Sequence, residues 1–238
     1  MLGTGQVCGG RVGCIETLSG VMDVVRILAL FALLIVQGCT TSVLVEGSVP
    51  TLLVNKIPAR IGVNYPDGFR TFRHKEEIRE AGNWDIDLGA QNFTFFSNLL
   101  DSLFLSVYEV GPPPHTQADM AELDGILIPS IEKYGFLTPS ISGLKFYSAS
   151  IEYRIALYDK AGKKIGDWNI IGYGKSEGGI FSSDEAINEA TVLAIRDGGA
   201  RIAIELIDQP AVVEWITELT AIDIGSDKVG TESIEEEE

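Results

Sequence analysis

The clearest pattern in the chain is a strict alternation of apolar and polar residues over positions 145–158. One face carries Tyr147, Ala149, Ile151, Tyr153, Ile155 and Leu157, and the other carries Ser148, Ser150, Glu152 and Arg154. A period of two is typical of a β-strand that buries one face. Residues 159–163 (DKAGK) supply a hairpin loop in which Gly162 accepts a positive φ. Residues 164–175 are therefore predicted to return as the antiparallel partner strand.

Two segments carry the period of an α-helix. Within residues 91–107, apolar residues recur at spacings of three and four, at Phe93, Phe96, Leu100, Leu103, Phe104 and Val107. A second helix, at residues 182–207, begins with a capping-box pattern formed by Ser182 and Glu185. Gly198 and Gly199 interrupt this helix, and they mark either a close packing point or a break into two helices.

The order of the elements indicates the fold class. Residues 59–65 and 124–137 have the pattern of strands, and residues 66–89 that of a loop. The order is thus strand, helix, strand, strand, strand, helix. Long adjacent strands joined by a hairpin favour an antiparallel or mixed sheet with helices packed on one face, which is an α+β fold. We predict one such domain over residues 59–222, with a last amphipathic segment that begins at Pro210.

A different kind of segment lies near the start, where ten apolar residues (27–36) run into the sequence VQGC, which ends at Cys39. The run is too short to span a membrane, which needs about 20 residues, and it has the length of a signal-peptide core. The end of the run resembles the lipobox of bacterial lipoproteins, although Gln37 is bulkier than usual at its place. The resemblance implies a signal peptide at residues 1–38 and a lipid covalently attached to Cys39.

The lipobox interpretation carries further expectations. Residues 1–21 are glycine-rich and weakly charged, so Met22 is expected to be the true start. Residues 39–58 are expected to form a lipidated tether. In the resembled lipoproteins an Asp after the cysteine commonly retains the protein in the inner membrane, so Thr40 suggests the outer membrane, facing the periplasm. The alternative is an ordinary secretory signal in which Cys39 is a free thiol.

The charge of the chain is strongly negative: 34 Asp and Glu stand against 18 Lys and Arg, for a formal net charge of −16. Residues 205–238 hold eleven acids and a single base, and residues 223–238 are predicted to form an acidic disordered tail or a docking segment for a basic partner. The charge argues against nucleic acid and against adsorption to anionic lipid head groups. Cys8 and Cys14 both precede Cys39, so no disulfide is expected in the mature chain.

No motif of an enzyme or of a metal site is complete. Residues 172–176 (GYGKS) resemble the end of a phosphate loop, but Asn169 stands where the first glycine is required. These glycines are interpreted instead as a bulge or a close backbone contact. His74 and His115 lack the spacing of metal ligands, so no metal is expected and no catalytic residue is assigned.

An enzyme would require His74 or His115 to converge with Asp85 or Asp87 in one cleft. Paired carboxylates can perform acid–base chemistry or bind calcium. In a loop, however, two acids are more simply interpreted as solvated side chains. The chain is therefore expected not to be an enzyme.

One basic cluster stands out on this acidic chain, and it comprises Arg70, Arg73, His74, Lys75 and Arg79. Acids interleave it, at Glu76, Glu77 and Glu80, so the favoured interpretation is a neutralised, salt-bridged surface. The sharper hypothesis is a contact site for an anionic envelope polymer or a partner protein. Its expected members are Arg70, Arg73, Lys75, Arg79 and Trp84.

Several segments together resemble a loose group of envelope lipoproteins. They are the VQGC motif, the IGV of the first strand, the phenylalanine-rich helix, the hairpin IEYRIALYDKAGKKIGDWNIIGYG and the alanine-rich helix after it. The group includes the YajG-like, penicillin-binding-protein-activator and curli-secretion lipoproteins, whose small α/β domain is similar to the amino-terminal domain of TolB. The resemblance covers residues 59–207 and implies a scaffold, activator or assembly factor. It maps no functional residue other than Cys39.

Two functions follow as hypotheses. The first is a non-enzymatic outer-membrane lipoprotein that presents a periplasmic domain to another envelope protein and needs no cofactor beyond the lipid on Cys39. The second is a ligand-binding lipoprotein that carries a lipid or a peptidoglycan fragment in a large apolar cavity between the 91–107 helix and the sheet. The sequence also allows a homo-oligomer in which a strand of one copy pairs with an exposed sheet edge of another.

Overall fold

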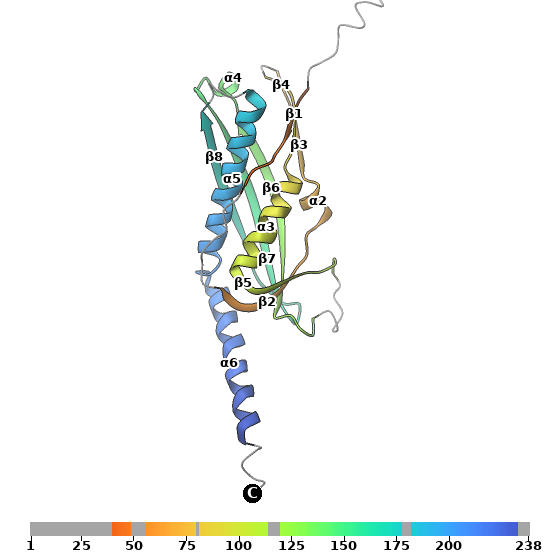
Figure 1. The fold of residues 1–238 in the computed structure, drawn as a ribbon, viewed down its shortest axis with the longest axis vertical. Coiled ribbons are helices and arrows are strands. Elements are labelled where there is room, and N and C mark those ends of the chain that lie inside the picture. Colours follow the sequence, from red (N-terminus) through yellow and green to blue (C-terminus); the bar gives the residue numbers. More distant parts are fainter. Residues whose placement is uncertain (1–39, 49–55, 80, 114–119, 178–181, 233–238) are drawn as a thin grey trace, which may run out of the picture. The chain divides into compact units, whose positions relative to one another are not determined.

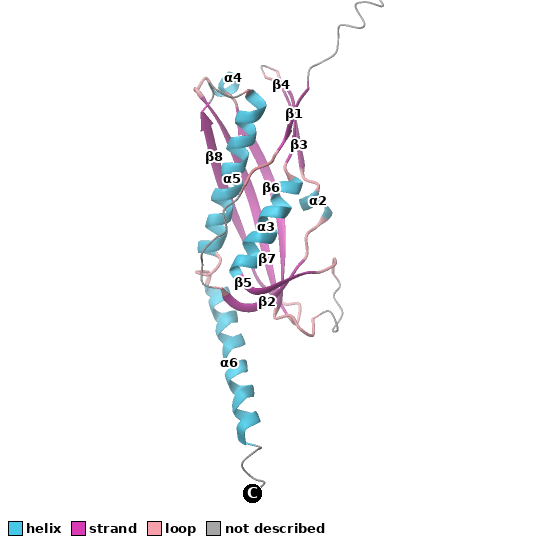
Figure 2. Cartoon of the chain, viewed as in Figure 1, coloured by secondary structure: helices cyan, strands magenta, loops and turns pink. Residues whose placement is uncertain are grey.

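Two β-sheets, with helices packed on them, make up the described part of the chain (Figure 1, Figure 2). The described residues belong to one unit of the fold, which begins at Thr40. The α+β prediction, with a mixed sheet, is confirmed. The computed structural model describes residues 40–48, 56–79, 81–113, 120–177 and 182–232, with residues 222–232 as backbone only.

Along the described part of the chain, four pairs of strands are separated by single helices, and two helices follow the last pair. The strands are β1 (Thr40–Leu44), β2 (Ile57–Val63), β3 (Arg73–Ile78), β4 (Gly82–Asp87), β5 (Phe104–Glu109), β6 (Gly125–Leu137), β7 (Phe146–Asp159) and β8 (Lys164–Glu177). The helices are α2 (Asp67–Arg70), α3 (Gly89–Leu103), α4 (Pro139–Ser142), α5 (Ser183–Glu205) and α6 (Pro210–Glu232).

The larger sheet has five strands in the order β5-β2-β6-β7-β8. The strands β5, β2 and β6 are parallel, whereas β6, β7 and β8 form an antiparallel meander. The hairpin between β7 and β8 lies where the sequence predicts it. Gly162 has a φ of 79°, and the Asp159 carboxylate accepts hydrogen bonds from the N–H groups of Ala161 (2.9 Å) and Lys163 (2.8 Å).

The smaller sheet has three strands in the order β1-β4-β3, and the sequence analysis did not predict it. The expected loop at residues 66–89 was wrong, because it contains α2 and the β3–β4 hairpin. The strand β3 (RHKEEI) has an apolar residue only at its end, so it shows no alternation of apolar and polar residues. Asp85 and Asp87 of β4 compensate its basic residues Arg73 and Lys75.

Three boundaries differ from the sequence-based expectation. The helix expected at residues 91–107 ends at Leu103, because Phe104–Glu109 pairs with β2 as β5. The expected tether at residues 39–58 contains β1, which pairs in parallel with β4. The tail expected to be disordered from residue 223 is helical as far as Glu232, as part of α6.

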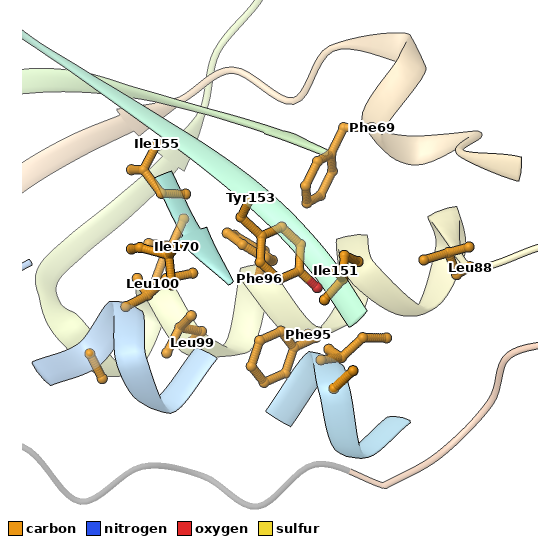
Figure 3. Packing of buried hydrophobic residues seen from close by; sticks show 14 of the residues in the cluster. Phe69, Leu88, Phe95, Phe96, Leu99, Leu100, Ile151, Tyr153, Ile155 and Ile170 are labelled. Carbon is orange, nitrogen blue, oxygen red and sulfur yellow. The ribbon is translucent and has the colours of Figure 1, made fainter. Parts of the chain in front are cut away.

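The core lies between the five-stranded sheet and the helices α3 and α5. In Figure 3, Phe96 of α3 packs on Tyr153 of β7, with ring centroids 5.0 Å apart. Gly198 of α5 lies against the same Tyr153 ring, because a Cβ there would come within 2.8 Å of it, and Gly199 lies against Phe95. The helix α5 is continuous through both glycines. Of the two interpretations of this pair, close packing is therefore confirmed.

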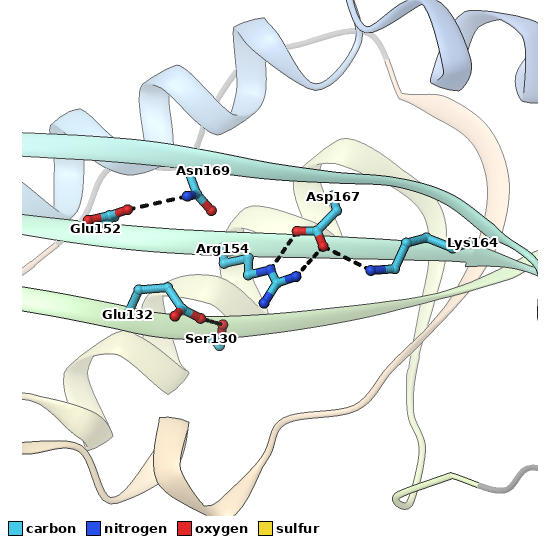
Figure 4. Close-up of polar contacts among 7 residues, drawn as sticks. All are labelled: Ser130, Glu132, Glu152, Arg154, Lys164, Asp167 and Asn169. Atoms are coloured by element: carbon cyan, nitrogen blue, oxygen red, sulfur yellow. Dashed lines mark hydrogen bonds and ion pairs between the residues drawn. The ribbon is translucent and has the colours of Figure 1, made fainter.

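The opposite face of the same sheet is polar where β6, β7 and β8 run side by side, with Glu152, Arg154 and Asn169 on it (Figure 4). Helices thus cover one face of the meander, as predicted. Within the described ranges, no helix combines the length and the apolar character that a membrane-spanning helix needs.

Candidate functional site

The basic cluster and the Asp85/Asp87 pair, which the sequence analysis treated as separate features, form one ladder of cross-strand ion pairs. In the β3–β4 register, Arg73 lies opposite Asp87 and Lys75 lies opposite Asp85. Arg73 donates a hydrogen bond to Asp85 and lies 3.7 Å from the Asp87 carboxylate. The Lys75 Nζ lies 3.7 Å from Asp85. The hydrogen bond from Arg73 lowers the pKa of Asp85, so this carboxylate is ionised and paired.

His74 lies on the other face of the same hairpin, because neighbouring residues of a strand point to opposite sides. Its ring packs on Tyr134 and Phe136, with centroid distances of 5.1 and 6.0 Å. Its Nε2 lies 3.0 Å from Glu76 Oε2. His74 therefore does not converge with Asp85 and Asp87, and His115 lies outside the described residues.

The five residues expected to form one contact surface do not share a surface. Trp84 is only 5% exposed, packs on Phe136 at 5.1 Å, and donates its indole N–H to the Ala81 carbonyl (2.9 Å). It is a core residue on the face opposite Arg73 and Lys75. Sequence reasoning could not separate these two roles for a tryptophan.

Arg70 lies in α2, away from the ladder. Its guanidinium stacks over Phe93 at 4.1 Å and over Tyr65 at 5.2 Å, and it pairs with Glu109 at 2.5 Å. Arg79 is exposed next to the turn between β3 and β4. Arg73 and Lys75 thus share the exposed face of the ladder, whereas Arg70 and Trp84 do not lie on it.

A second charged surface, which the sequence analysis did not assign, lies on the open face of the β6–β7–β8 meander (Figure 4). The Arg154 Nε donates to Asp167 at 2.6 Å, and the Lys164 Nζ lies 2.8 Å from the same carboxylate. Beside them, Glu152 pairs with Lys133 at 3.1 Å and accepts from Asn169 at 3.3 Å. All of these side chains except Lys164 line a shallow hollow. The signal in the sequence that could have identified this surface was the alternation of apolar and polar residues over positions 145–158, which places Glu152 and Arg154 on the polar face.

The chemistry of this surface follows from its pairing. Hydrogen bonds from Arg154 and Lys164 hold the pKa of Asp167 well below its usual range. A carboxylate in this state stays ionised near neutral pH and holds no proton to donate. The surface is therefore suited to charge-paired, hydrated contact with a polar partner. Within the described residues, no three His, Cys, Asp or Glu side chains come together in a way that could hold a metal ion.

The segment that follows β1 is fastened to the helices by two amide side chains. Asn188 of α5 accepts from the Glu46 N–H (3.0 Å) and donates to its carbonyl (3.2 Å). Gln91 of α3 does the same for Gly47, with distances of 3.3 and 2.8 Å. Residues 45–48, here called the strap, are thus held against both helices. Cys39, the expected lipidation site, lies outside the described residues.

No protein-family model and no curated protein sequence matches the chain. Several solved structures resemble it. A DUF330-family protein of Xanthomonas campestris has 11% identity and a TM-score of 0.42, over 78% of this chain and 99% of that one. A protein of Helicobacter pylori described as a homologue of a neuraminyllactose-binding hemagglutinin has 13% identity and a TM-score of 0.46, over 70% and 92%.

Lipoproteins are among these structures. A minor lipoprotein of Acinetobacter baumannii has 9% identity and a TM-score of 0.33, and the match covers 67% of this chain and 96% of that one. Likenesses at this level carry no argument about the activity of this chain.

Proposed function

We propose that this protein is a bacterial envelope lipoprotein, acylated at Cys39, whose domain binds another envelope protein without catalysing a reaction. The observation that carries the proposal is where the fold begins. The unit of the fold starts at Thr40, directly after the cysteine that ends the lipobox-like sequence. The apolar run before that cysteine has the length of a signal-peptide core. Thr40 supports the outer membrane as the location.

Charge-paired faces support contact with a protein partner. The β3–β4 ladder and the open face of the meander present both signs of charge on regular strands. Electrostatic complementarity of this kind contributes specificity and association rate more than affinity. The strand β8 lies at the edge of the sheet, where a strand of another chain could pair with it. One of its N–H groups is already occupied, because the Asp197 carboxylate accepts the N–H of Tyr173 (2.9 Å).

The alternative, a carrier of a lipid or a peptidoglycan fragment, requires a large apolar cavity between α3 and the sheet. In the described residues that space is filled by buried side chains of both elements, among them Phe96, Leu100, Ile151 and Tyr153 (Figure 3). Ring contacts at 5.0 Å leave no room for an acyl chain between Phe96 and Tyr153. We therefore prefer the partner-binding function.

The first test compares the wild type with Cys39→Ala after expression in a bacterial envelope, by intact mass and by membrane fractionation. We expect the wild type to carry the mass of a diacylglycerol and an acyl chain, and Cys39→Ala to leave the outer-membrane fraction. Thr41→Ala is the matched control, since it changes a residue close to Cys39 without removing the thiol, and it is expected to change neither result. A soluble wild type without lipid mass would overturn the proposal.

Partner binding is tested separately by mild crosslinking in the envelope, followed by purification of the lipidated protein. We expect a discrete crosslinked species that contains a second envelope protein. The double variant Arg154→Ala, Lys133→Ala removes two cations of the open face and is expected to weaken that species. Lipidated protein that crosslinks to nothing would contradict the partner-binding part alone.

A further inference from the structure

The start of β1 is fixed in the fold without a spacer. Thr40, the residue bonded to Cys39, pairs with Asn83 of β4, and Thr41 pairs with Trp84. The strap then fastens the continuing chain to α3 and α5. A lipid on Cys39 would therefore hold the adjoining end of the domain within a few residues of the bilayer surface, at about 3.3 Å per extended residue.

The connection between β6 and β7, which contains α4, lies at the same end. Phe136, near the end of β6, packs on Trp84 with ring centroids 5.1 Å apart, and Trp84 is the partner of Thr41. The strand β6 runs opposite to β1 and β4, since Tyr134 contacts His74, the partner of Ile86, further along β4. The residues after Phe136 therefore continue toward the start of β1. Figure 1 shows α4 and the start of β1 at one end of the described fold.

Three large apolar side chains are exposed at the end of β6 and in this connection. Leu137 is 41% exposed, Ile141 37% and Leu144 49%, all within eight residues. Gly143, which has a φ of 70°, forms the turn at the end of α4, between Ile141 and Leu144 in the sequence. Exposed apolar residues scattered singly need no explanation, but a cluster of them marks a contact surface.

We propose that residues 137–144, here called the apical loop, insert into the interface of a phospholipid bilayer and set the orientation of the domain on the membrane. The inference rests on the proposed lipidation of Cys39 and adds a second contact with the same bilayer. Ile141 and Leu144 enter among the head groups, as apolar side chains of interfacial segments do. Both signs of charge lie near this end, since Lys145 follows Leu144 and Lys175 stacks over Phe146, the partner of Glu177. The contact is therefore carried by the apolar side chains and does not require anionic lipid.

The test places a lipid-sensitive fluorophore (NBD) on Leu144→Cys in the full lipidated protein, reconstituted in phosphatidylcholine vesicles that contain doxyl-labelled lipid. Acylated Cys39 has no free thiol, and Cys8 and Cys14 precede the cleavage site, so the new cysteine is the only one labelled. Leu105→Cys is the matched control. Leu105 is equally apolar and 56% exposed, but it lies on β5, whose neighbour β2 pairs only with the first residues of β6.

We expect several-fold stronger quenching and a clear blue shift of emission at position 144 compared with position 105. A tenfold range of anionic lipid content is expected to leave the difference unchanged. Equal quenching at the two positions in protein whose intact mass shows the lipid on Cys39 would overturn the apical-loop proposal alone. Absence of the lipid mass would instead overturn the proposed function on which it rests.

Discussion

At the scale of single residues, a buried polar pair joins the sheet to α3 in the core. Tyr153 donates its hydroxyl hydrogen to the Asn92 side-chain carbonyl, and the Asn92 amide donates to the Leu88 carbonyl at 2.8 Å. Both side chains are fully buried. Burial raises the pKa of the Tyr153 hydroxyl, so it stays a donor. The pair links the sheet to the start of α3 and fixes the rotamer of the ring that α5 also contacts.

Tyr153→Phe is expected to lower the free energy of unfolding by about 1–3 kcal/mol, because the Asn92 carbonyl would remain buried without a donor. Urea unfolding followed by circular dichroism measures the change. Tyr173→Phe is the matched control, since Tyr173 is 54% exposed, and its loss should stay within about 0.5 kcal/mol. Equal effects of the two variants would show that the hydroxyl of Tyr153 does not matter for stability.

The pairing of Asp167 predicts how stability depends on pH. Its pKa in the folded chain lies below the ordinary 3.8, so the ionised form favours the folded state. This contribution is complete above that ordinary value and is lost as the pH falls through the lower, folded-state value. We expect Asp167→Asn to be less stable than the wild type at pH 7 and the difference to shrink below about pH 4.

Unfolding curves between pH 2 and pH 7 measure this effect, which is small because the ion pairs are partly exposed. Asp159→Asn is the comparison variant for Asp167→Asn. The Asp159 carboxylate lies in the adjacent hairpin, and its partners are backbone N–H groups instead of cations. A difference between the wild type and Asp167→Asn that grows toward acid pH would contradict the sign.

At the scale of elements, α5 and β8 make a close backbone contact. A Cβ at Gly174 would collide with the backbone carbonyl of Ala190, and one at Gly172 with that of Ala194. The Ser176 hydroxyl, in the same row, donates to the Ala186 carbonyl at 2.6 Å. The helix therefore lies directly on the strand backbone, at a distance that only glycine permits.

Gly174→Ala is expected to cost about 1–3 kcal/mol of stability, because the rigid backbone of α5 has to move away from β8. Thermal unfolding measures the loss. Gly68→Ala is the control, since nothing lies within 4 Å of the position that its Cβ would take. A stable Gly174→Ala variant would mean that α5 tolerates a shift and that the contact is not tight.

The elements that could be predicted from the sequence are those specified by local patterns. The alternation in β7, the glycine of its hairpin and the Ser182–Glu185 capping box are all confirmed, because each depends on neighbouring residues. The strands β1, β3 and β5 have no such pattern. The apolar residues Phe104 and Val107 fit a helical period as well as a strand, and only the pairing with β2 decides between them.

The charged surfaces were predictable only in part, because they too depend on how strands pair. The sequence analysis expected the basic cluster to be neutralised, and this is confirmed for Arg73 and Lys75. The interleaved glutamates were expected to neutralise the cluster. In the structure, Asp85 and Asp87 supply the negative charge that pairs with these two residues. Which acid faces which base depends on the register of two strands, and that register is not visible in a segment interpreted as a loop.

At the scale of the whole molecule, the first residues that the structure describes are fixed to the domain at two places, by the pairing of β1 with β4 and by the strap. Arg196 adds a hydrogen bond to the Ser48 carbonyl. A protein anchored through a flexible tether would reorient freely relative to the membrane. If Cys39 carries the proposed lipid, the strand that begins at Thr40 would transmit the position of that anchor to the rest of the domain. Orientation on the membrane would then be a property of the fold.

A flexible spacer between Cys39 and Thr40 is expected to uncouple the proposed anchor from the fold. A 20-residue Gly/Ser linker between Cys39 and Thr40, with Thr as its first residue, spans about 25 Å on average. We expect such a protein to keep its lipid mass, its outer-membrane fraction and its unfolding midpoint. Quenching of the fluorophore at Leu144→Cys should fall several-fold, toward the value at Leu105→Cys, because the apical loop is no longer held at the surface. Undiminished quenching would mean that the loop binds lipid by its own affinity and that β1 does not set the orientation.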